Sequence, residues 1–250
     1  MIATGHETAL SSVDNIVSYP SYASTSAYAA PLDARMTFVR KTYAHLAGAV
    51  GLFVAISALL YSAGVGEAVL VWMGASRFGW LLILGGFMVA GYGAQALARS
   101  SRSLGLQYVG LGLYAVLEAL IFTPMIYIAA KYAPGVLPEA TIITLAAFTG
   151  LTAYVFFSKK DFSFMGPALA IAGFVALGVI VVGVIFGLNL GVWFSALMVL
   201  FASGAVVYST SNVLRVYPTD QYVAAALDLF AAVALLFWYV LRILLELQRR

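Results

Sequence analysis

The chain has 250 residues, of which 63% are hydrophobic and only 9% are charged. Soluble domains have about 25% charged residues, so this composition indicates an integral membrane protein. The formal net charge of +3 comes from Lys and Arg residues scattered along the chain, which argues against a nucleic-acid-binding patch. The chain contains no cysteine, and this excludes disulfide frameworks, thiolate metal sites and cysteine nucleophiles.

The N-terminal segment, residues 1–34, differs from the rest of the chain. It is rich in Ser, Thr, Tyr and Ala, contains Pro20 and Pro31, and shows neither helical nor strand periodicity. No Lys or Arg precedes Arg35 and no apolar run is present, which argues against a cleaved signal peptide. We therefore expect a disordered cytoplasmic tail over residues 1–34, followed by one transmembrane domain over residues 35–250.

Seven apolar runs follow the tail, and each has about the 20 residues that a helix needs to cross a bilayer. Their periodicity is helical, whereas the strands of a membrane barrel would be shorter and alternating. The runs are 42–63, 78–98, 105–130, 138–157, 166–186, 192–212 and 221–247. The breaks between them are too short for an extramembrane domain. The predicted fold class is therefore all-α integral membrane, with seven transmembrane helices.

The basic residues between the runs predict the orientation of the chain. With a cytoplasmic N-terminus, only Arg77 and Lys131 fall on the outer side, as the positive-inside rule requires. The inner basic residues are Arg35, Arg40, Lys41, Arg99, Arg102, Lys159, Lys160 and Arg215. The C-terminal Arg242, Arg249 and Arg250 do not follow this bias, so the last segment either returns to the cytoplasm or carries these charges outside. For a bacterial source, the expected location is the plasma membrane.

Two of the apolar runs contain a carboxylic acid well away from their ends. Asp228 lies two turns into the last run, where an ionised carboxylate costs about 2.5–3.5 kcal/mol, so it is expected to face protein or a watery cavity. The alternative is a place in the headgroup region, because the last run is longer than the bilayer requires. Glu118 lies deep in the third run, near Pro124. It is either part of a functional site or a hydrogen-bonded acid that ties helices together.

The chain contains no complete sequence motif of the enzyme classes that act within membranes. There is no HExxH pair, and the chain has two histidines in total, too few for a typical zinc site. Intramembrane aspartyl proteolysis needs two embedded aspartates, and Asp228 is alone. The segment FASG at 201–204 lacks the first glycine of a serine motif, and no histidine follows it. We therefore expect no enzymatic activity, no cofactor and no resident metal.

Four stretches between Arg35 and Glu246 carry a family resemblance. They read FVRKTYAHLAGAV, LQYVGLGLYAVLEALIFTPMIYIA, FTGLTAYVFFSKKDFSFMGPAL, and VVYSTSNVL followed by AAALDLFAAVALLFWYVLRIL. Taken together, they resemble the Bax inhibitor-1 (transmembrane Bax inhibitor motif) family. The resemblance implies a seven-helix fold in which the last helix is central and surrounded by the other six. It also implies a pH-sensitive leak of cations, chiefly calcium, across the membrane.

The chain departs from the family pattern at one position. The family often has Tyr-Asp at the end of the sixth span, and that aspartate shares a proton with the aspartate of the last helix. Here the pair is Tyr208-Ser209, so only Asp228 matches, although Ser209 could still hydrogen-bond to it. We therefore expect a weakened or displaced pH response, unless Glu118 acts as the second carboxylate.

The sequence also indicates candidate basic partners for Asp228. Arg99 and Arg102 follow the second span, at the end of the bundle where the last run begins. Either of them is a candidate salt-bridge partner for Asp228, and the alternative is that both are ordinary loop residues of the inner side.

The expected mechanism is a gated cation pathway whose inner seal includes the last helix. In this prediction, protonated Asp228 keeps the helix packed, and its ionised form favours water penetration and a cation. Calcium prefers six or more oxygen ligands, and one carboxylate with hydroxyl groups cannot hold it tightly. Calcium would therefore pass with weak binding. The alternative function is a non-conducting regulator that binds other membrane proteins, such as membrane-anchored proteases. The expected partners are thus the lipid bilayer, a cation in transit and, in the alternative, other membrane proteins.

Overall fold

The computed structural model describes residues 26–75, 78–100, 103–158 and 160–248. Within these ranges, seven helices are long and apolar enough to cross a membrane, which confirms the predicted fold class. The spans are α1 (Leu32–Ser62), α3 (Gly79–Ala98), α4 (Leu104–Tyr132), α5 (Val136–Ser158), α6 (Gly166–Phe186), α7 (Gly191–Arg215) and α8 (Tyr222–Gln248). Two shorter elements are α2 (Val65–Gly74) and the 3₁₀ turn η1 (Ser163–Met165).

Local sequence accounts for several helix ends. The Ser103 hydroxyl accepts a hydrogen bond from the Leu106 amide at 3.2 Å, which caps the start of α4. Pro167 lies in the first turn of α6, where its missing N–H leaves no hydrogen bond unmade. Gly187 ends α6 in the left-handed conformation, with φ 67°. The boundaries of the bundle are thus set by the chain itself as well as by hydrophobic burial.

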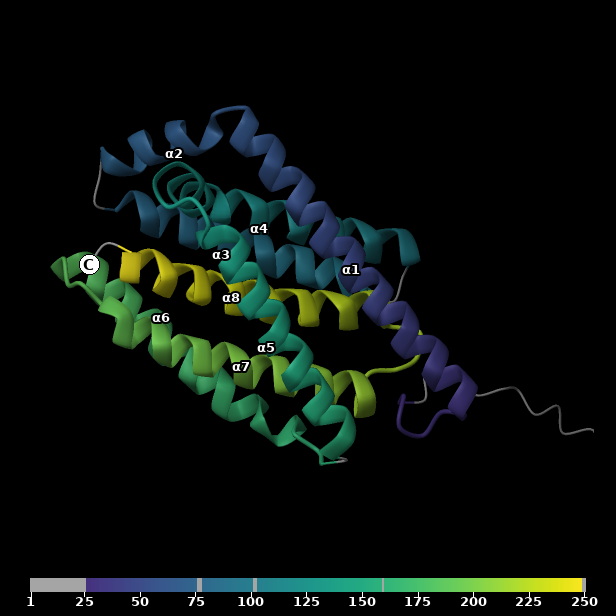
Figure 1. Ribbon diagram of the computed structural model, residues 1–250. Coiled ribbons are helices and arrows are strands. Elements are labelled where there is room, and N and C mark those ends of the chain that lie inside the picture. Colours follow the sequence, from purple (N-terminus) through teal and green to yellow (C-terminus); the bar gives the residue numbers. More distant parts are fainter. Residues whose placement is uncertain (1–25, 76–77, 101–102, 159, 249–250) are drawn as a thin grey trace, which may run out of the picture.

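The last helix, α8, lies at the centre of the bundle. It contacts α1, α3, α4, α5 and α7, while α6 packs against α7. It is also the most buried of the seven spans, followed by α4. Figure 1 shows α8 running between α3 and α4 on one side and α6 and α7 on the other. The predicted central position of the last helix is therefore confirmed, with α6 in an outer layer on α7.

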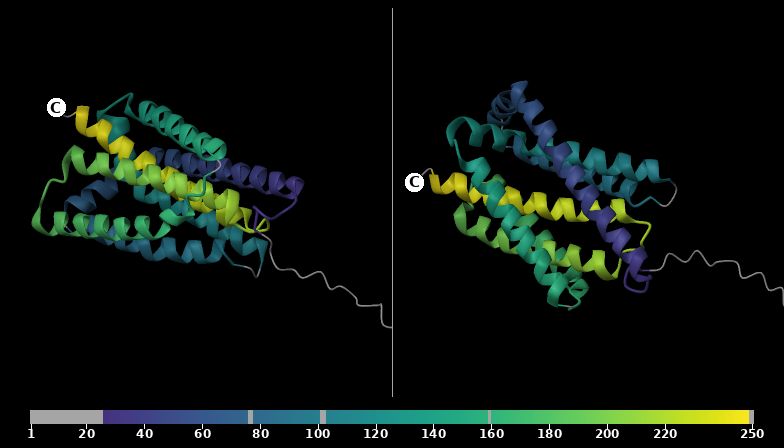
Figure 2. Two further views of the ribbon diagram at one scale, coloured as in Figure 1. Left: turned by 90° about the horizontal axis from the view of Figure 1, so that it is seen from below. Right: turned by 45° about the vertical axis from the view of Figure 1, so that its right-hand side comes forward.

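The bundle has two ends that differ in composition. The end with the start of α1 and the α3–α4, α5–α6 and α7–α8 connections is called the basic end here, because Arg99, Lys160 and Arg215 lie there. The opposite end, called the α2 end, holds α2 and the end of α8. Figures 1 and 2 show the start of α1 and the C-terminus at opposite ends. Since α8 is one continuous helix, the last segment crosses the bundle and does not return.

The segment before α1 is the main difference from the predicted boundaries. The Ala27 amide donates to the Tyr217 carbonyl at 2.8 Å, and Ala27 is fully buried. The helix α1 already begins at Leu32. The predicted disordered tail is therefore wrong for residues 26–34, and its remainder lies outside the described residues. Charged residues in the first turns of α1 lower its hydropathy but do not oppose helix formation. The apolar run therefore begins at residue 42, ten residues after the helix begins.

The sequence prediction also missed α2, an apolar helix of 10 residues between α1 and α3. It packs on α4 so closely that a Cβ on Gly66 would lie 2.5 Å from the Cβ of Tyr127. The Tyr127 hydroxyl donates to the Glu67 carboxylate at 2.8 Å, and Lys131 Nζ lies 3.9 Å from the same carboxylate. Because α2 is too short to cross a bilayer, a search for spans passes over it.

Candidate functional site

Asp228 lies near the basic end of α8 and is paired with an arginine. Its Oδ1 accepts a hydrogen bond from Arg99 Nη2 at 2.7 Å, and its Oδ2 accepts one from the Tyr217 hydroxyl. The Asp228 side chain is 22% exposed and that of Arg99 is 48% exposed. The carboxylate thus faces protein groups instead of lipid. Arg99 is the candidate partner that the structure places on Asp228, while Arg102 lies outside the described residues.

Three elements converge on this ion pair. Arg99 directly follows α3, and its Nη1 donates to the Gln95 side chain one turn earlier at 3.3 Å. Tyr217 belongs to the α7–α8 connection, where its amide donates to the Asn212 carbonyl at 3.0 Å. Asp228 comes from α8 itself. The ion pair therefore joins the end of α3, the α7–α8 connection and the first turns of the central helix.

The partners of Asp228 keep their protons over the accessible pH range. Burial lowers the pKa of Arg99, but the charge of Asp228, the neighbouring Tyr217 and the hydrogen bonds to both together outweigh burial, so that the net effect is a raised pKa. Burial and then the neighbouring Asp228 carboxylate raise the pKa of Tyr217 above its ordinary value of 10.0. Arg99 therefore stays a cation and Tyr217 stays a donor. Within this trio, only the carboxyl group can change its charge as the pH changes.

Glu118 lies on α4, is 6% exposed, and lines the same cavity as Asp228. Its carboxyl group interacts with the hydroxyl of Tyr114, one turn earlier on α4. Tyr114 in turn lies close enough to both Glu118 and Asp228 for an electrostatic interaction with each of them. Tyr114 therefore links the two acids that the sequence singled out. No direct hydrogen bond between the two acids occurs in the described part of the chain.

Ser209 and Tyr208 lie on α7 and line the cavity as well. Ser209 is buried, at 7% exposure, but the described residues include no hydrogen bond between its hydroxyl and Asp228. The two carboxylate oxygens of Asp228 accept hydrogen bonds from Arg99 and Tyr217 instead. The hydrogen bond between Ser209 and Asp228 that the sequence allowed is thus not formed among the described residues, although both side chains line the same cavity.

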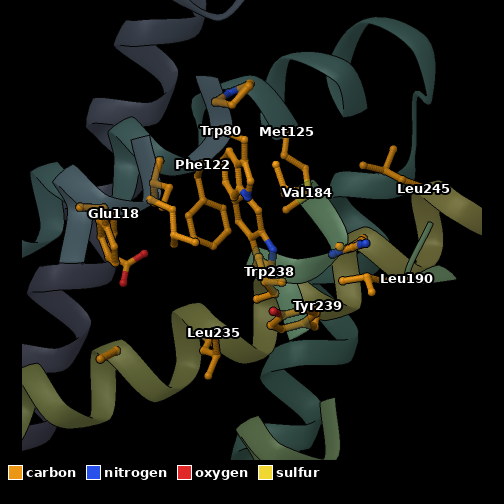
Figure 3. A pocket seen from close by; sticks show the side chains of 18 of the residues that line it. Trp80, Glu118, Phe122, Met125, Val184, Leu190, Leu235, Trp238, Tyr239 and Leu245 are labelled. Atoms are coloured by element: carbon orange, nitrogen blue, oxygen red, sulfur yellow. The ribbon is translucent and has the colours of Figure 1, made fainter. Parts of the chain in front are cut away.

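The four predicted pathway residues share one cavity of about 1340 Å³. It extends along α8 from Asp228 to Glu246 and is also lined by α3, α4, α6, α7 and two residues of α2. At a rise of about 1.5 Å per residue, this stretch of α8 is about 27 Å long, close to the roughly 30 Å of a bilayer core. Figure 3 shows Glu118, Trp238 and Leu245 along its walls. The cavity therefore runs nearly the full depth of the bundle.

Residues that the sequence did not single out complete the site. Tyr114 lies four residues before Glu118, so the helical period could have indicated it. Tyr217 and Gln95 gave no such signal, because their place beside Asp228 depends on how α3 and the α7–α8 connection meet. No group of three or more His, Asp or Glu side chains suited to a metal ion occurs among the residues that the structure describes.

Comparisons with known proteins agree with this architecture. The family model "Inhibitor of apoptosis-promoting Bax1" matches residues 35–250. Bax inhibitor 1 of Schizosaccharomyces pombe is 29% identical over 222 residues, which cover 86% of this chain and 78% of the yeast protein. LIFEGUARD 3 of Arabidopsis thaliana is 29% identical over 150 residues, covering 58% of this chain and 59% of the plant protein. The Golgi anti-apoptotic protein of Vaccinia virus (strain Lister) is 30% identical over 118 residues, covering 45% and 48%.

The match thus spans about three fifths of the length of LIFEGUARD 3 and about half of the viral protein. The family model, by contrast, covers the seven spans except for the first three residues of α1, and every residue of the ion pair and the cavity. The chain belongs to the Bax inhibitor-1 family of multi-pass membrane proteins.

Proposed function

We propose that the protein is a pH-sensitive leak pathway for cations, with calcium as the main cation in transit. The observation that carries the proposal is the cavity of about 1340 Å³ along α8, which has Glu118 and Asp228 on its wall. Carboxylates along a pathway attract cations and mark ion routes in membrane proteins. The pathway follows α8 between the basic end and the α2 end.

The ion pair between Asp228 and Arg99 is the closure of this pathway at the basic end. It joins α8 to the end of α3, and the Tyr217 hydroxyl holds the second carboxylate oxygen. Protonation of Asp228 neutralises the acid and leaves Arg99 charged, so the bond that joins the two helices weakens. Acidification therefore opens the basic end. The closed state is the ionised one, the reverse of the assignment favoured by the sequence, because the carboxylate has a cationic partner.

The acids of the cavity suit passage of calcium better than storage. Calcium takes six to eight oxygen ligands, whereas the cavity wall offers hydroxyls, two amides and three carboxyl groups spread along its length, those of Glu118, Asp228 and Glu246. The charged and titratable groups that interact with Asp228 are Arg99, Tyr217 and Tyr114, and Tyr114 also interacts with Glu118. A cation in this space is attracted but held weakly, as conduction requires.

The test is calcium flux into liposomes that contain the purified protein and an enclosed indicator. Arg99→Gln removes the cation of the ion pair and leaves Asp228 in place, so we expect a faster leak at neutral pH. Lys160→Gln, a loss of charge at the same end outside the site, serves as the matched control and leaves the leak unchanged. A leak that Arg99→Gln does not alter would contradict the proposed closure.

A protein without any flux would instead support a non-conducting regulator that binds other membrane proteins. The name of the viral relative, Golgi anti-apoptotic protein, describes an effect on cell death without naming transport, and it favours this second function. Crosslinking in intact membranes, followed by identification of attached membrane proteins such as anchored proteases, tests it. Flux and partner binding are measured separately, so each function can fail alone.

A further inference from the structure

The cavity changes its chemistry twice along α8. Near the basic end its polar lining residues are Gln95, Tyr114, Glu118, Tyr208, Ser209 and Asp228. Near the α2 end, the polar lining consists of Asn189, Tyr239, Arg242 and Glu246. Between these two polar compartments, the lining residues are apolar or aromatic.

Three aromatic rings from three helices meet in the apolar stretch. The Trp80 ring of α3 stacks on the Trp238 ring of α8 with centroids 5.5 Å apart. The Phe122 ring of α4 meets Trp238 edge to face at 4.9 Å. The Phe237 ring stacks on the Phe122 ring with centroids 5.7 Å apart. Figure 3 shows Trp80, Phe122 and Trp238 between Glu118 on one side and Leu190 and Leu245 on the other.

We propose that Trp80, Phe122 and Trp238, called the aromatic barrier here, block the cavity between its two polar compartments. This inference rests on the proposed conduction, and it adds a second closure about 15 Å along α8 from Asp228. The rings come from α3, α4 and α8, and α3 and α8 are also the helices that the Arg99–Asp228 ion pair joins. A loosened ion pair would therefore let the two tryptophans separate.

The physical basis is the cost of moving a hydrated ion past apolar rings. A narrow apolar segment expels water, and an ion that leaves its water without new oxygen ligands meets a large energy barrier. The cluster offers two indole N–H groups, which are donors and cannot coordinate a cation. The aromatic barrier thus keeps the polar compartments apart even though both are part of one cavity.

Because the chain has no cysteine, single cysteine substitutions test the barrier directly. Ala231→Cys places a thiol two turns before Trp238, in the compartment of Asp228, and Leu245→Cys places one two turns after it; both positions line the cavity. A membrane-impermeant methanethiosulfonate reagent is applied from the α2 end. We expect the thiol at 245 to be modified and the thiol at 231 to be protected.

Substituting Trp238→Ala in the Ala231→Cys protein should raise the rate of modification by about tenfold or more, because water then fills the apolar segment. The rate at position 245 should stay the same. Phe194→Ala is the matched control, since Phe194 packs against the ring of Tyr239 at 6.2 Å and does not line the cavity. Trp80→Leu, a milder change in the same cluster, should act in the same direction as Trp238→Ala.

Rapid modification at position 231 with all three rings intact would overturn the barrier. Protection that persists in both Trp238→Ala and Trp80→Leu, while position 245 still reacts normally, would overturn it as well. The readout does not require ion flux. A barrier that opens to the reagent in a protein without calcium flux would therefore refute the proposed conduction and leave the aromatic barrier standing.

Discussion

Asp228 shows how far a single residue can be interpreted from sequence and where structure is needed. Its depth in an apolar run predicted a sheltered carboxylate, and the structure places it against Arg99 and Tyr217. The sequence indicated Arg99 as one of two candidate salt-bridge partners of Asp228. It did not indicate Tyr217, because no periodicity relates a residue of a connection to a residue of the next helix. Partners on the same helix, such as Tyr114 and Glu118, follow from spacing, whereas partners across helices do not.

Ser209 offers a prediction at the same scale. Ser209→Asp adds a carboxyl group to the cavity that contains Asp228, and two close carboxylates cannot both ionise cheaply. The calcium leak of the variant should then change over a wider pH range in two steps, with its midpoint at higher pH than in the parent. The measurement is liposome flux from pH 5 to pH 8. Ser209→Ala, which adds no charge, should keep the parent profile, and an unchanged profile in Ser209→Asp would contradict a shared site.

At the scale of elements, the α3–α4 contact depends on a glycine. A Cβ on Gly110 would lie 2.4 Å from the Ala98 backbone nitrogen and 2.6 Å from the Ala94 carbonyl oxygen. Since backbone atoms cannot rotate away, Gly110→Ala should separate the helices and destabilise the protein by about 1–3 kcal/mol. Thermal unfolding in detergent measures the effect. Gly112→Ala, which meets nothing within 4 Å, is the control, and equal midpoints for both variants would contradict the close packing.

The α5–α6 connection supplies a pH-dependent prediction. The Ser163 backbone amide donates to the Asp161 carboxylate at 2.9 Å, and the Ser211 hydroxyl of α7 lies 3.3 Å from it. The Ser163 amide lowers the pKa of Asp161 from its ordinary 3.8. A lowered folded-state pKa means that the ionised group stabilises the fold above about pH 4 and loses this effect as the pH falls through the folded-state pKa.

Asp161→Ala should therefore lower the free energy of unfolding at pH 7 by less than about 1 kcal/mol, because the side chain is exposed, and should lower the unfolding midpoint slightly. The difference from the parent should vanish at a pH below the folded-state pKa of Asp161. Thermal unfolding at both pH values checks this, with Asp220→Ala in the α7–α8 connection as the control. A difference of the same size at both pH values would mean that charge plays no part.

The elements themselves were largely predictable, for physical reasons that also explain the exceptions. Hydropathy found α6 and α7 almost to the residue, because their flanks are polar or contain glycine. It placed the start of α1 ten residues late, since Arg35, Arg40 and Lys41 interrupt the apolar run. It passed over α2 because this helix is too short to cross a membrane. The cavity and its aromatic cluster could not be predicted, because they depend on which faces of α3, α4 and α8 meet.

At the scale of the whole molecule, the orientation in the membrane remains a prediction that one experiment decides. The basic end carries most of the Lys and Arg residues between the spans, so we expect it in the cytoplasm. The C-terminus lies at the opposite end (Figure 2). A tag after residue 250 should therefore be accessible from outside intact cells, and a tag before residue 1 only after permeabilisation. Two tags on the same side would contradict the structure, while an exposed N-terminus alone would reverse the orientation.

The proposed gating depends on one closure that responds to protons, the ion pair between Arg99 and Asp228. The most direct measurement is the pH dependence of calcium flux in liposomes for the parent, Arg99→Gln, Asp228→Asn and the double variant. We predict that the parent leak rises as the pH falls. Each single variant should leak faster than the parent at neutral pH by about fivefold or more, with a flat pH profile in Asp228→Asn. The double variant should leak no faster than the single ones. Equal flux and equal pH profiles in all four proteins would contradict the closure and, with it, the proposed gating.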